Sequence, residues 1–301
     1  MHAAVKCVGA LIGAGAAAFG WALAEAHLFT LRRATLPVLP PGSEAIEVLH
    51  ISDLHLLPSQ RDKLRFVRGL ASLKPDLVVN TGDNISTGAA IGPLRDALDG
   101  LGGVPGVFIF GSNDYQAPHF KNPLRYVTQG RSTATSDDVA PSLPTSELRE
   151  ALESLGWVDL THRRHTMRLR GLTVEFRGTD DAHHDRDDYD AVAGGPAPDV
   201  DLAVGVTHAP YLRLLDAMTA DGVAAIFAGH THGGQVCVPG YGALTTNCDL
   251  EADRVRGAST HTVDAQTAHL HVSAGLGTSP FAPIRFACRP EASLVTLAAR
   301  S

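Results

Sequence analysis

The residues of this sequence that suit catalysis or metal binding are Asp, Asn and His side chains placed directly after short apolar runs. Imidazole nitrogens combined with carboxylate oxygens are ligands typical of Mn²⁺, Fe and Zn²⁺ rather than Ca²⁺. One such segment is a weak signal, because an isolated Asp after a strand is more often a cap or turn residue. Five of them follow one another along the chain and together predict a metal centre: 53–55 (DLH), 82–84 (GDN), 111–114 (GSND), 207–210 (THAP) and 229–234 (GHTHGG).

The apolar runs beside these segments predict the secondary structure that carries the polar side chains. Strands are predicted at 46–52, 76–83, 106–114, 201–210 and 223–234. Further elements are predicted as helices at 61–73 and 146–156, a hairpin at 165–181 and a closing strand at 293–299. Strands that alternate with helices are typical of a parallel sheet, whose carboxyl strand ends meet at one edge. We therefore expect the five polar segments to converge.

Composition and charge fit a globular protein and exclude several other classes. The 301 residues are 19% charged and 44% hydrophobic, which excludes a disordered or collagen-like chain. The formal net charge of −7 gives no broad cationic field, so we expect no sequence-specific nucleic-acid partner. Histidine is unusually frequent, with 15 residues, in keeping with a metal site. The four cysteines form no CxxC pair, which excludes a zinc ribbon and leaves a pairing of Cys237 with Cys248 open.

An uncharged stretch of Gly, Ala and larger apolar residues covers 8–24, near the N-terminus. Its 17 residues are at the lower limit for a membrane-spanning helix. Three interpretations are open, namely a membrane anchor or uncleaved signal, a helix packed on the domain surface, and a cleaved signal. An anchor implies membrane contact through 8–24 and a membrane-associated protein, whereas without one the protein is expected to be cytoplasmic.

After this segment the chain is predicted to form one folded domain. Residues 1–29 are assigned to the hydrophobic helix, and the prolines at 37, 40 and 41 indicate an extended linker over 30–43. The domain then covers 44–301 without an internal repeat. Its polar stretch 116–146 is predicted to be an irregular insertion.

The order of the five segments resembles that of the calcineurin-like metallophosphoesterases. Their motifs run D-x-H, G-D, G-N-H-D/E, a His and then G-H-x-H. The resemblance extends from about Ile46 to Leu297, includes the late elements GLG (275–277) and RPE (289–291), and is closest to the bacterial branch with an N-terminal hydrophobic segment. It implies an α/β fold in which two β-sheets pack face to face and are flanked by helices, a four-layer αββα arrangement.

The resemblance also implies a role for each ligand and two divalent metal ions as cofactors. The first metal would be held by Asp53, His55 and His232, and the second by Asn113, His208 and His230. Asp83 would bridge the two metals. The ions would be Mn, Fe or Zn, and the sequence does not choose among the three.

The GSND loop departs from the family pattern, which has a His directly after the ligand Asn. One placement puts Asn113 on the ligand Asn and Asp114 on the His, whereas the other puts Ser112 on the ligand and Asn113 on the His. We prefer the first, because Asn is the better ligand. Near two cations Asp114 should be ionised and so a poor general acid. Asp83, Asn113 and Asp114 are then the expected catalytic residues, and His119 is a candidate proton donor.

Other polar residues receive more modest interpretations. Asp180, Asp181 and His183 follow a predicted strand and could form a polar wall that contacts the substrate. His50 is interpreted as a packing residue. His271 is interpreted as a surface or strand-face residue.

The function implied by the resemblance is that of a binuclear metal-dependent hydrolase that cleaves a phosphoester with metal-activated hydroxide. A phosphodiester or pyrophosphate substrate is favoured, because diester leaving groups often need less protonation and the loop lacks its His. The alternative, motivated by the departure at Asp114, is a catalytically impaired metal-binding scaffold protein that kept the fold.

Overall fold

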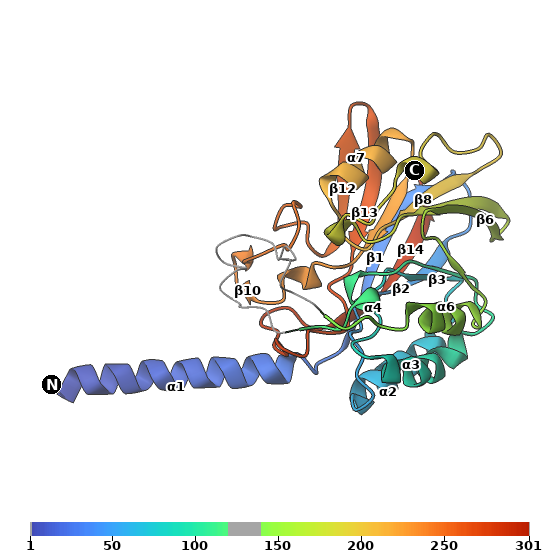
Figure 1. The fold of residues 1–301 in the computed structure, drawn as a ribbon. Coiled ribbons are helices and arrows are strands. Elements are labelled where there is room, and N and C mark those ends of the chain that lie inside the picture. Colours follow the sequence, from blue (N-terminus) through green and yellow to red (C-terminus); the bar gives the residue numbers. More distant parts are fainter. Residues whose placement is uncertain (1, 120–139, 301) are drawn as a thin grey trace.

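The computed structural model describes residues 2–119 and 140–300, and two six-stranded sheets form its centre (Figure 1). The first sheet contains, in spatial order, β1 (Thr30–Leu39), β14 (Glu291–Ala299), β2 (Ile46–Ile51), β3 (Leu77–Asn80), β4 (Gly106–Phe108) and β5 (Trp157–Asp159). The strands β2 to β5 are parallel, β14 is antiparallel to β2, and β1 is parallel to β14.

The second sheet is also mixed. It contains, in spatial order, β12 (Gly257–Val263), β13 (Gln266–Val272), β9 (Ala225–Ala228), β8 (Leu202–Val206), β7 (Leu172–Gly178) and β6 (Arg163–Leu169). The four central strands are parallel, and the two edge strands pair antiparallel with their neighbours. A separate two-stranded hairpin is formed by β10 (Cys237–Val238) and β11 (Gly242–Ala243).

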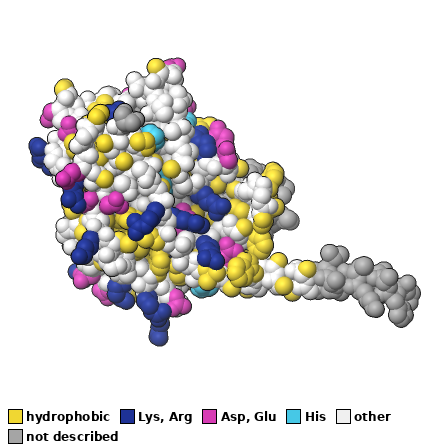
Figure 2. Space-filling view, turned by 180° about the vertical axis from the view of Figure 1, so that it is seen from behind, with side chains coloured by type: hydrophobic (Ala, Val, Ile, Leu, Met, Phe, Trp, Pro, Cys, Tyr) yellow, Lys and Arg dark blue, Asp and Glu magenta, His cyan; other side chains and the backbone are white. Residues whose placement is uncertain are grey.

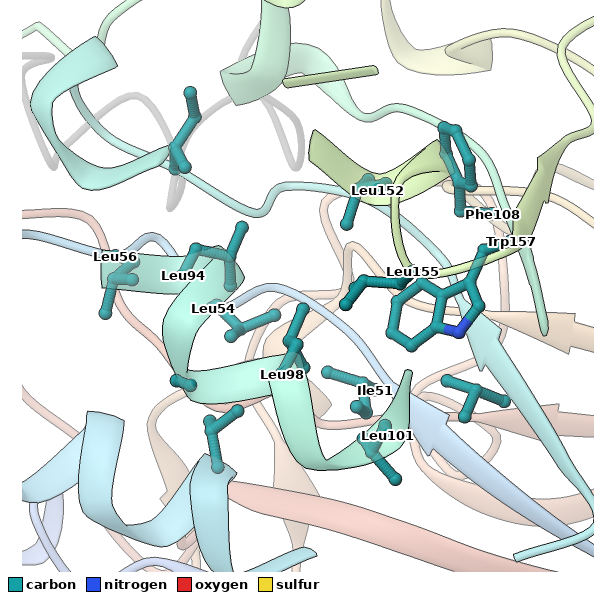
Figure 3. Packing of buried hydrophobic residues seen from close by; sticks show 14 of the residues in the cluster. Ile51, Leu54, Leu56, Leu94, Leu98, Leu101, Phe108, Leu152, Leu155 and Trp157 are labelled. Atoms are coloured by element: carbon teal, nitrogen blue, oxygen red, sulfur yellow. The ribbon is translucent and has the colours of Figure 1, made fainter. Parts of the chain in front are cut away.

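Helices cover the outer faces of both sheets. The first sheet carries α2 (Arg61–Gly69), α3 (Ile91–Leu98) and α6 (Thr145–Glu153), and the second carries α7 (Leu212–Ala220). Figure 3 shows buried side chains of the helix layer and of the first sheet pointing toward one another, among them Leu94, Leu98, Leu152, Ile51 and Trp157. Among the described residues the remaining helices are α1 (His2–Glu25), the short α4 (Ser112–Tyr115) and the 3-10 turns 70–73, 88–90, 99–101, 182–184, 190–192 and 232–234.

The inner faces of the two sheets pack on each other. One buried cluster contains Leu36, Val48 and Val79 of the first sheet together with Phe176 and Phe227 of the second. Strands covered on both faces need apolar side chains in succession, which explains the unbroken apolar runs in β3, β8 and β9. The structure thus confirms the predicted αββα arrangement of two sheets between helices.

The prediction of an extended linker over 30–43 is wrong for 30–39, which form β1. This strand pairs with β14 over nearly its whole length, so the sheet begins before the expected domain start at residue 44. The prolines misled the interpretation, because proline is excluded from central strands but tolerated on an edge strand. β1 is the edge strand of its sheet, and Pro37 lies on it with an exposed side chain.

The other predicted elements are found close to their expected places. The helix over 61–73 is α2 followed by a 3-10 turn, the hairpin over 165–181 is β6 and β7, and the closing strand lies within β14. Most of the predicted insertion, 120–139, lies outside the described residues, and its last residues begin α6. Residues 8–24 lie in α1, and no described helix is both long and apolar enough to span a membrane.

Replacing Leu36 by Ala tests whether β1 belongs to the folded unit. The Leu36 side chain is fully buried between the sheets, so Leu36→Ala should lower the free energy of unfolding by about 2–5 kcal/mol. Thr35→Ala, at the neighbouring exposed position, should change it by about 0.5 kcal/mol or less. Urea unfolding at matched metal loading measures both, and an unchanged stability of Leu36→Ala would restore the linker interpretation.

Candidate metal centre

The predicted ligands meet where loops from both sheets converge. Asp53 and His55 follow β2, Asp83 follows β3, His208 follows β8 and His230 follows β9. Parallel strands deliver their carboxyl ends to one edge, and the packing of the two sheets brings the two edges together. The expected convergence of the segments is therefore observed.

The first group of ligands consists of Asp53, His55 and His232, whose ligand atoms all lie within 4.8 Å of one another. The Nε2 atoms of His55 and His232 are 3.1 Å apart. Asp53 Oδ1 lies 4.0 Å from the first of these nitrogens and 3.7 Å from the second. This is the set that the resemblance assigned to the first metal.

The second group is centred on His208. Asp53, Asp83 and His208 also lie within 4.8 Å of one another, and His230 Nδ1 is 3.3 Å from His208 Nε2. Asp83 Oδ2 lies 3.3 Å from His55 Nε2 and 3.6 Å from His208 Nε2. The Asp83 carboxylate thus stands between the two groups, where a bridging ligand is expected.

The donor chemistry of both groups fits divalent cations. His208 Nδ1 donates to the Thr81 carbonyl oxygen at 2.7 Å, and His232 Nδ1 lies 3.2 Å from the Gly277 carbonyl oxygen. A neutral ring that donates to a carbonyl through one nitrogen keeps a lone pair on the other, which is the form that binds a cation. A cation among these nitrogens would also offset the buried carboxylates.

The loops hold these ligands in a strained backbone. Asp53, His55, Asp83, His230 and His232 all have φ between 43° and 68°, in the left-handed region that residues with a Cβ rarely adopt. Such strain costs roughly 1–3 kcal/mol per residue and persists only where the surroundings enforce it. Its concentration at the predicted ligands indicates that the fold is arranged around this centre.

Burial and neighbouring charges shift the pKa values of the ligands. Burial lowers the pKa of His55 to about 4 and raises the pKa of Asp53 to about 6. At His208 burial disfavours protonation, but the carboxylates of Asp83 and Asp53 outweigh it and raise the pKa to about 9. The carboxylates of Asp83 and Asp53 therefore favour positive charge beside them, and a divalent cation supplies such a charge.

The GSND loop places its residues in different roles. The Asn113 side chain contacts the bridging residue, with Nδ2 2.8 Å from Asp83 Oδ2, and its backbone N–H donates to Asp83 Oδ1. Because the two ends of an amide are assigned from hydrogen bonding, either end of Asn113 can face a cation there. The side chain of Asn113 therefore lies among the predicted ligands, and its role as a ligand stays a prediction.

Asp114 is buried in contact with both neighbouring loops. Its side chain is 0% exposed and accepts hydrogen bonds from the backbone N–H groups of Asn84 at 2.7 Å and Gly111 at 3.1 Å. Burial, and then the charge of Asp83, raise the pKa of Asp114 to about 7. Asp114 thus fixes one loop against the other, and its ionisation beside two bound cations stays a prediction.

The candidate proton donor and the predicted polar wall lie in different parts of the structure. His119 is half-buried and lies at the end of the described segment 2–119, so its role as proton donor stays a prediction. Asp181 is fully buried, and the His183 ring lies tilted beside the ring of the predicted ligand His230, with centroids 4.4 Å apart. The predicted polar wall therefore borders the centre.

Three positions show what the sequence did not reveal. Arg285 is fully buried and donates to the carbonyl oxygens of Ala274 at 2.6 Å and Gly277 at 2.7 Å, but no motif marks it. His271 is a strand-face residue of β13 rather than a surface residue, since it is 1% exposed, and its Nδ1 is 2.9 Å from His50 Nδ1. His50 was expected to be a packing residue, whereas it also belongs to this buried polar contact.

The cysteines also need a correction. Cys237 and Cys248 are both free thiols, so the pairing left open by the sequence is not formed. Cys237 lies instead beside Cys288, since both thiols donate to the Gly233 carbonyl oxygen, at 3.2 and 3.4 Å. Burial in this apolar cluster packs them against the loop that carries His232.

A family model, two relatives and a solved structure match this chain. Residues 46–234 match the family model described as calcineurin-like phosphoesterase. The chain is 26% identical over 300 residues to the uncharacterized protein YpbG of Bacillus subtilis (strain 168), covering 99% of this chain and 98% of that one. It is 25% identical over 305 residues to the uncharacterized metallophosphoesterase YkuE of the same strain, covering 96% and 92%. The crystal structure of TT1561 of Thermus thermophilus aligns with a TM-score of 0.42 at 8% identity, covering 77% and 91%.

A methyl group at Gly111 tests how closely the loops approach the bridging carboxylate. A Cβ there would overlap Asp83 Oδ1 and the His208 ring, so Gly111→Ala should weaken metal binding about 10-fold or more. Gly92→Ala, in α3 where a Cβ would meet no atom within 4 Å, should leave it unchanged. Titration calorimetry measures both affinities, with circular dichroism to confirm folding. Equal affinities would contradict the placement of Asp83 and His208.

Proposed function

The chain belongs to the calcineurin-like phosphoesterase family, and on this premise we propose that it hydrolyses phosphodiester or pyrophosphate bonds at a centre of two divalent cations. Membership makes it a metal-dependent phosphoesterase. The observation that carries the finer proposal is the position of Asp83 Oδ2, 3.3 Å from His55 Nε2 and 3.6 Å from His208 Nε2. A carboxylate between two groups of ligands is what a bridging role requires.

The proposed centre shares its ligands between two cations, Mn²⁺, Fe or Zn²⁺. We assign Asp53, His55 and His232 to the first, Asn113, His208 and His230 to the second, and Asp83 to both. Two such cations lower the pKa of a water molecule and offset negative charge on the phosphoryl oxygens. The chain's own contribution is to hold the ligands in fixed positions, which the strained loops and buried carbonyl contacts support.

The GSND loop favours a diester or pyrophosphate substrate. The loop has no His, and its acidic residue, Asp114, is occupied by backbone N–H groups. A leaving group of low basicity departs with little help from a proton donor, whereas a basic one needs it. The phosphate that leaves a pyrophosphate and the phenolate that leaves an aryl diester are of the first kind.

Hydrolysis of bis(p-nitrophenyl) phosphate tests the proposed reaction. Turnover should appear with Mn²⁺, Fe²⁺ or Zn²⁺ and disappear on chelation, because the bound cations would lower the pKa of the attacking water. Asp83→Ala should lose the bound metal and the activity together, measured by metal analysis and release of p-nitrophenol. Asp96→Ala, which removes an exposed partner of Arg95 on α3, is the matched control and should keep both.

Two results would contradict parts of this proposal. Asp83→Ala that retains two metals per chain would exclude the bridging role of that residue. A wild-type protein that binds two metals but hydrolyses no phosphodiester or pyrophosphate with any of the three ions would favour the scaffold alternative.

We propose further that residues 8–24 contact a membrane. In Figures 1 and 2 α1 projects from the domain, and the described part of it carries Phe19 at 57% and Trp21 at 49% exposure. Its end is fixed to the domain, because Glu25 accepts from the backbone N–H groups of Ala287 and Cys288. Exposed Phe and Trp side chains on a helix are typical of elements that lie in the interface of a bilayer.

Sedimentation with liposomes tests the proposed membrane contact. The full chain should sediment with the vesicles, and Phe19→Asp combined with Leu23→Asp should reduce the bound fraction at least about 10-fold, since two charges would enter the apolar boundary. Ala220→Asp, at an exposed site on α7, is the control and should bind like the wild type. Equal binding by all three proteins would exclude α1 as the contact.

A further inference from the structure

The segment that follows β7 forms one border of the candidate metal centre. It contains Asp181 and the 3-10 turn Ala182–His184. The His183 ring lies 4.4 Å from the ring of the predicted ligand His230, and 5.0 Å from the ring of His184, centroid to centroid. This segment therefore brings two histidines to the side of the proposed second metal.

His184 is held there by two contacts. Its Nδ1 atom lies 2.9 Å from Asp181 Oδ2 and 3.0 Å from Ser112 Oγ, and Ser112 Oγ itself donates to Asp181 Oδ2 at 2.6 Å. Asp181 is fully buried, and its other oxygen accepts from the backbone N–H of His183 at 2.9 Å. A carboxylate held in this way fixes the tautomer and the orientation of a histidine, leaving Nε2 on the opposite side of the ring.

The contact with Ser112 places His184 at the loop that lacks the family's histidine. Ser112 directly precedes Asn113, whose side chain contacts the bridging Asp83. The side chain of His184 is 27% exposed, so it is within reach of a solvent-borne substrate. His184 thus stands beside the loop from which the proton donor is missing, although it comes from another strand end.

Given the proposed phosphoesterase function, we propose that His184 donates a proton to leaving-group oxygens that are too basic to depart unaided and that the GSND loop by itself does not protonate. The phosphorus forms a bond to the oxygen of water, and its bond to the leaving oxygen breaks with the electron pair remaining on that oxygen. The proton on His184 Nε2 moves to the leaving oxygen. Water gives one proton to the solvent, and His184 regains its proton from the solvent.

Other residues near the centre are less suited to this role. Asp114 is fully buried, and its carboxylate faces backbone N–H groups rather than solvent. The His183 ring lies against the ring of the predicted ligand His230, and its Nδ1 contacts the Tyr211 hydroxyl at 3.0 Å. His184 combines partial exposure with a buried carboxylate behind its ring, which is the arrangement of a histidine that transfers protons.

A series of methyl aryl phosphates with 2,4-dinitrophenyl, p-nitrophenyl and phenyl leaving groups tests the proposal. Leaving-group basicity rises along this series, and with it the need for a proton. His184→Gln should lower kcat for the phenyl ester about 100-fold or more, and for the 2,4-dinitrophenyl ester less than about 5-fold. Metal content, measured on the same preparations, should remain that of the wild type, because His184 is not a ligand.

The control variant and the contrary outcomes separate this role from a structural one. His165→Gln, on the edge strand β6, should behave like the wild type with every ester. An equal loss with all three leaving groups, no loss with any, or a lower metal content in His184→Gln would each overturn the proposal. A wild-type protein that cleaves none of the esters would overturn the proposed function and this role together. A loss of kcat in His184→Gln that grows with leaving-group basicity is expected only if the proposed function and the role of His184 are both correct.

Discussion

The structure depends on one electrostatic constraint, the crowding of histidine nitrogens around two buried carboxylates, Asp53 and Asp83. Two pairs of histidine nitrogens face each other at 3.1 and 3.3 Å on either side of Asp83. Two carboxylates in a buried site are tolerable only with positive charge beside them. The positive φ values of five predicted ligands follow from the same constraint, because the loops must turn sharply to aim their side chains at one point.

The two sheets are tied together by polar contacts as well as by their apolar core. Ser52 donates to Asp53 at 2.5 Å and accepts from Thr81 at 2.6 Å. Thr81 in turn lies 3.0 Å from His50, whose ring reaches His271 of the second sheet. A buried chain of satisfied hydrogen bonds permits few alternative arrangements. Asp53 is therefore positioned by both sheets, which is why their packing and the geometry of the metal centre are not independent.

The sequence predicted what is local and regular, and missed what is long-range. The strands, the αββα layers and the convergence of the polar segments follow from apolar runs and from the family motifs, each of which is contained in a few consecutive residues. Pro37 misled the linker prediction, because edge and central strands differ only in their neighbours. The contact that holds Asp114 was not predicted, because its partner Asn84 is thirty residues away. The contact between Ser112 and His184 joins residues 72 apart, and no spacing rule reports such a pair.

The Gly111–Asp114 loop shows that the residues that build a site and those that set its reaction are separable. Asp114 ties Gly111 and Asn84 together, and Gly111 admits the Asp83 carboxylate and the His208 ring because it lacks a side chain. Asp114 stands at the position of the family's histidine in the preferred placement, so here that position holds the loop together. A proton donor must then come from a neighbouring segment. The strand end after β7 lies near enough to do so, since its Asp181 already binds Ser112.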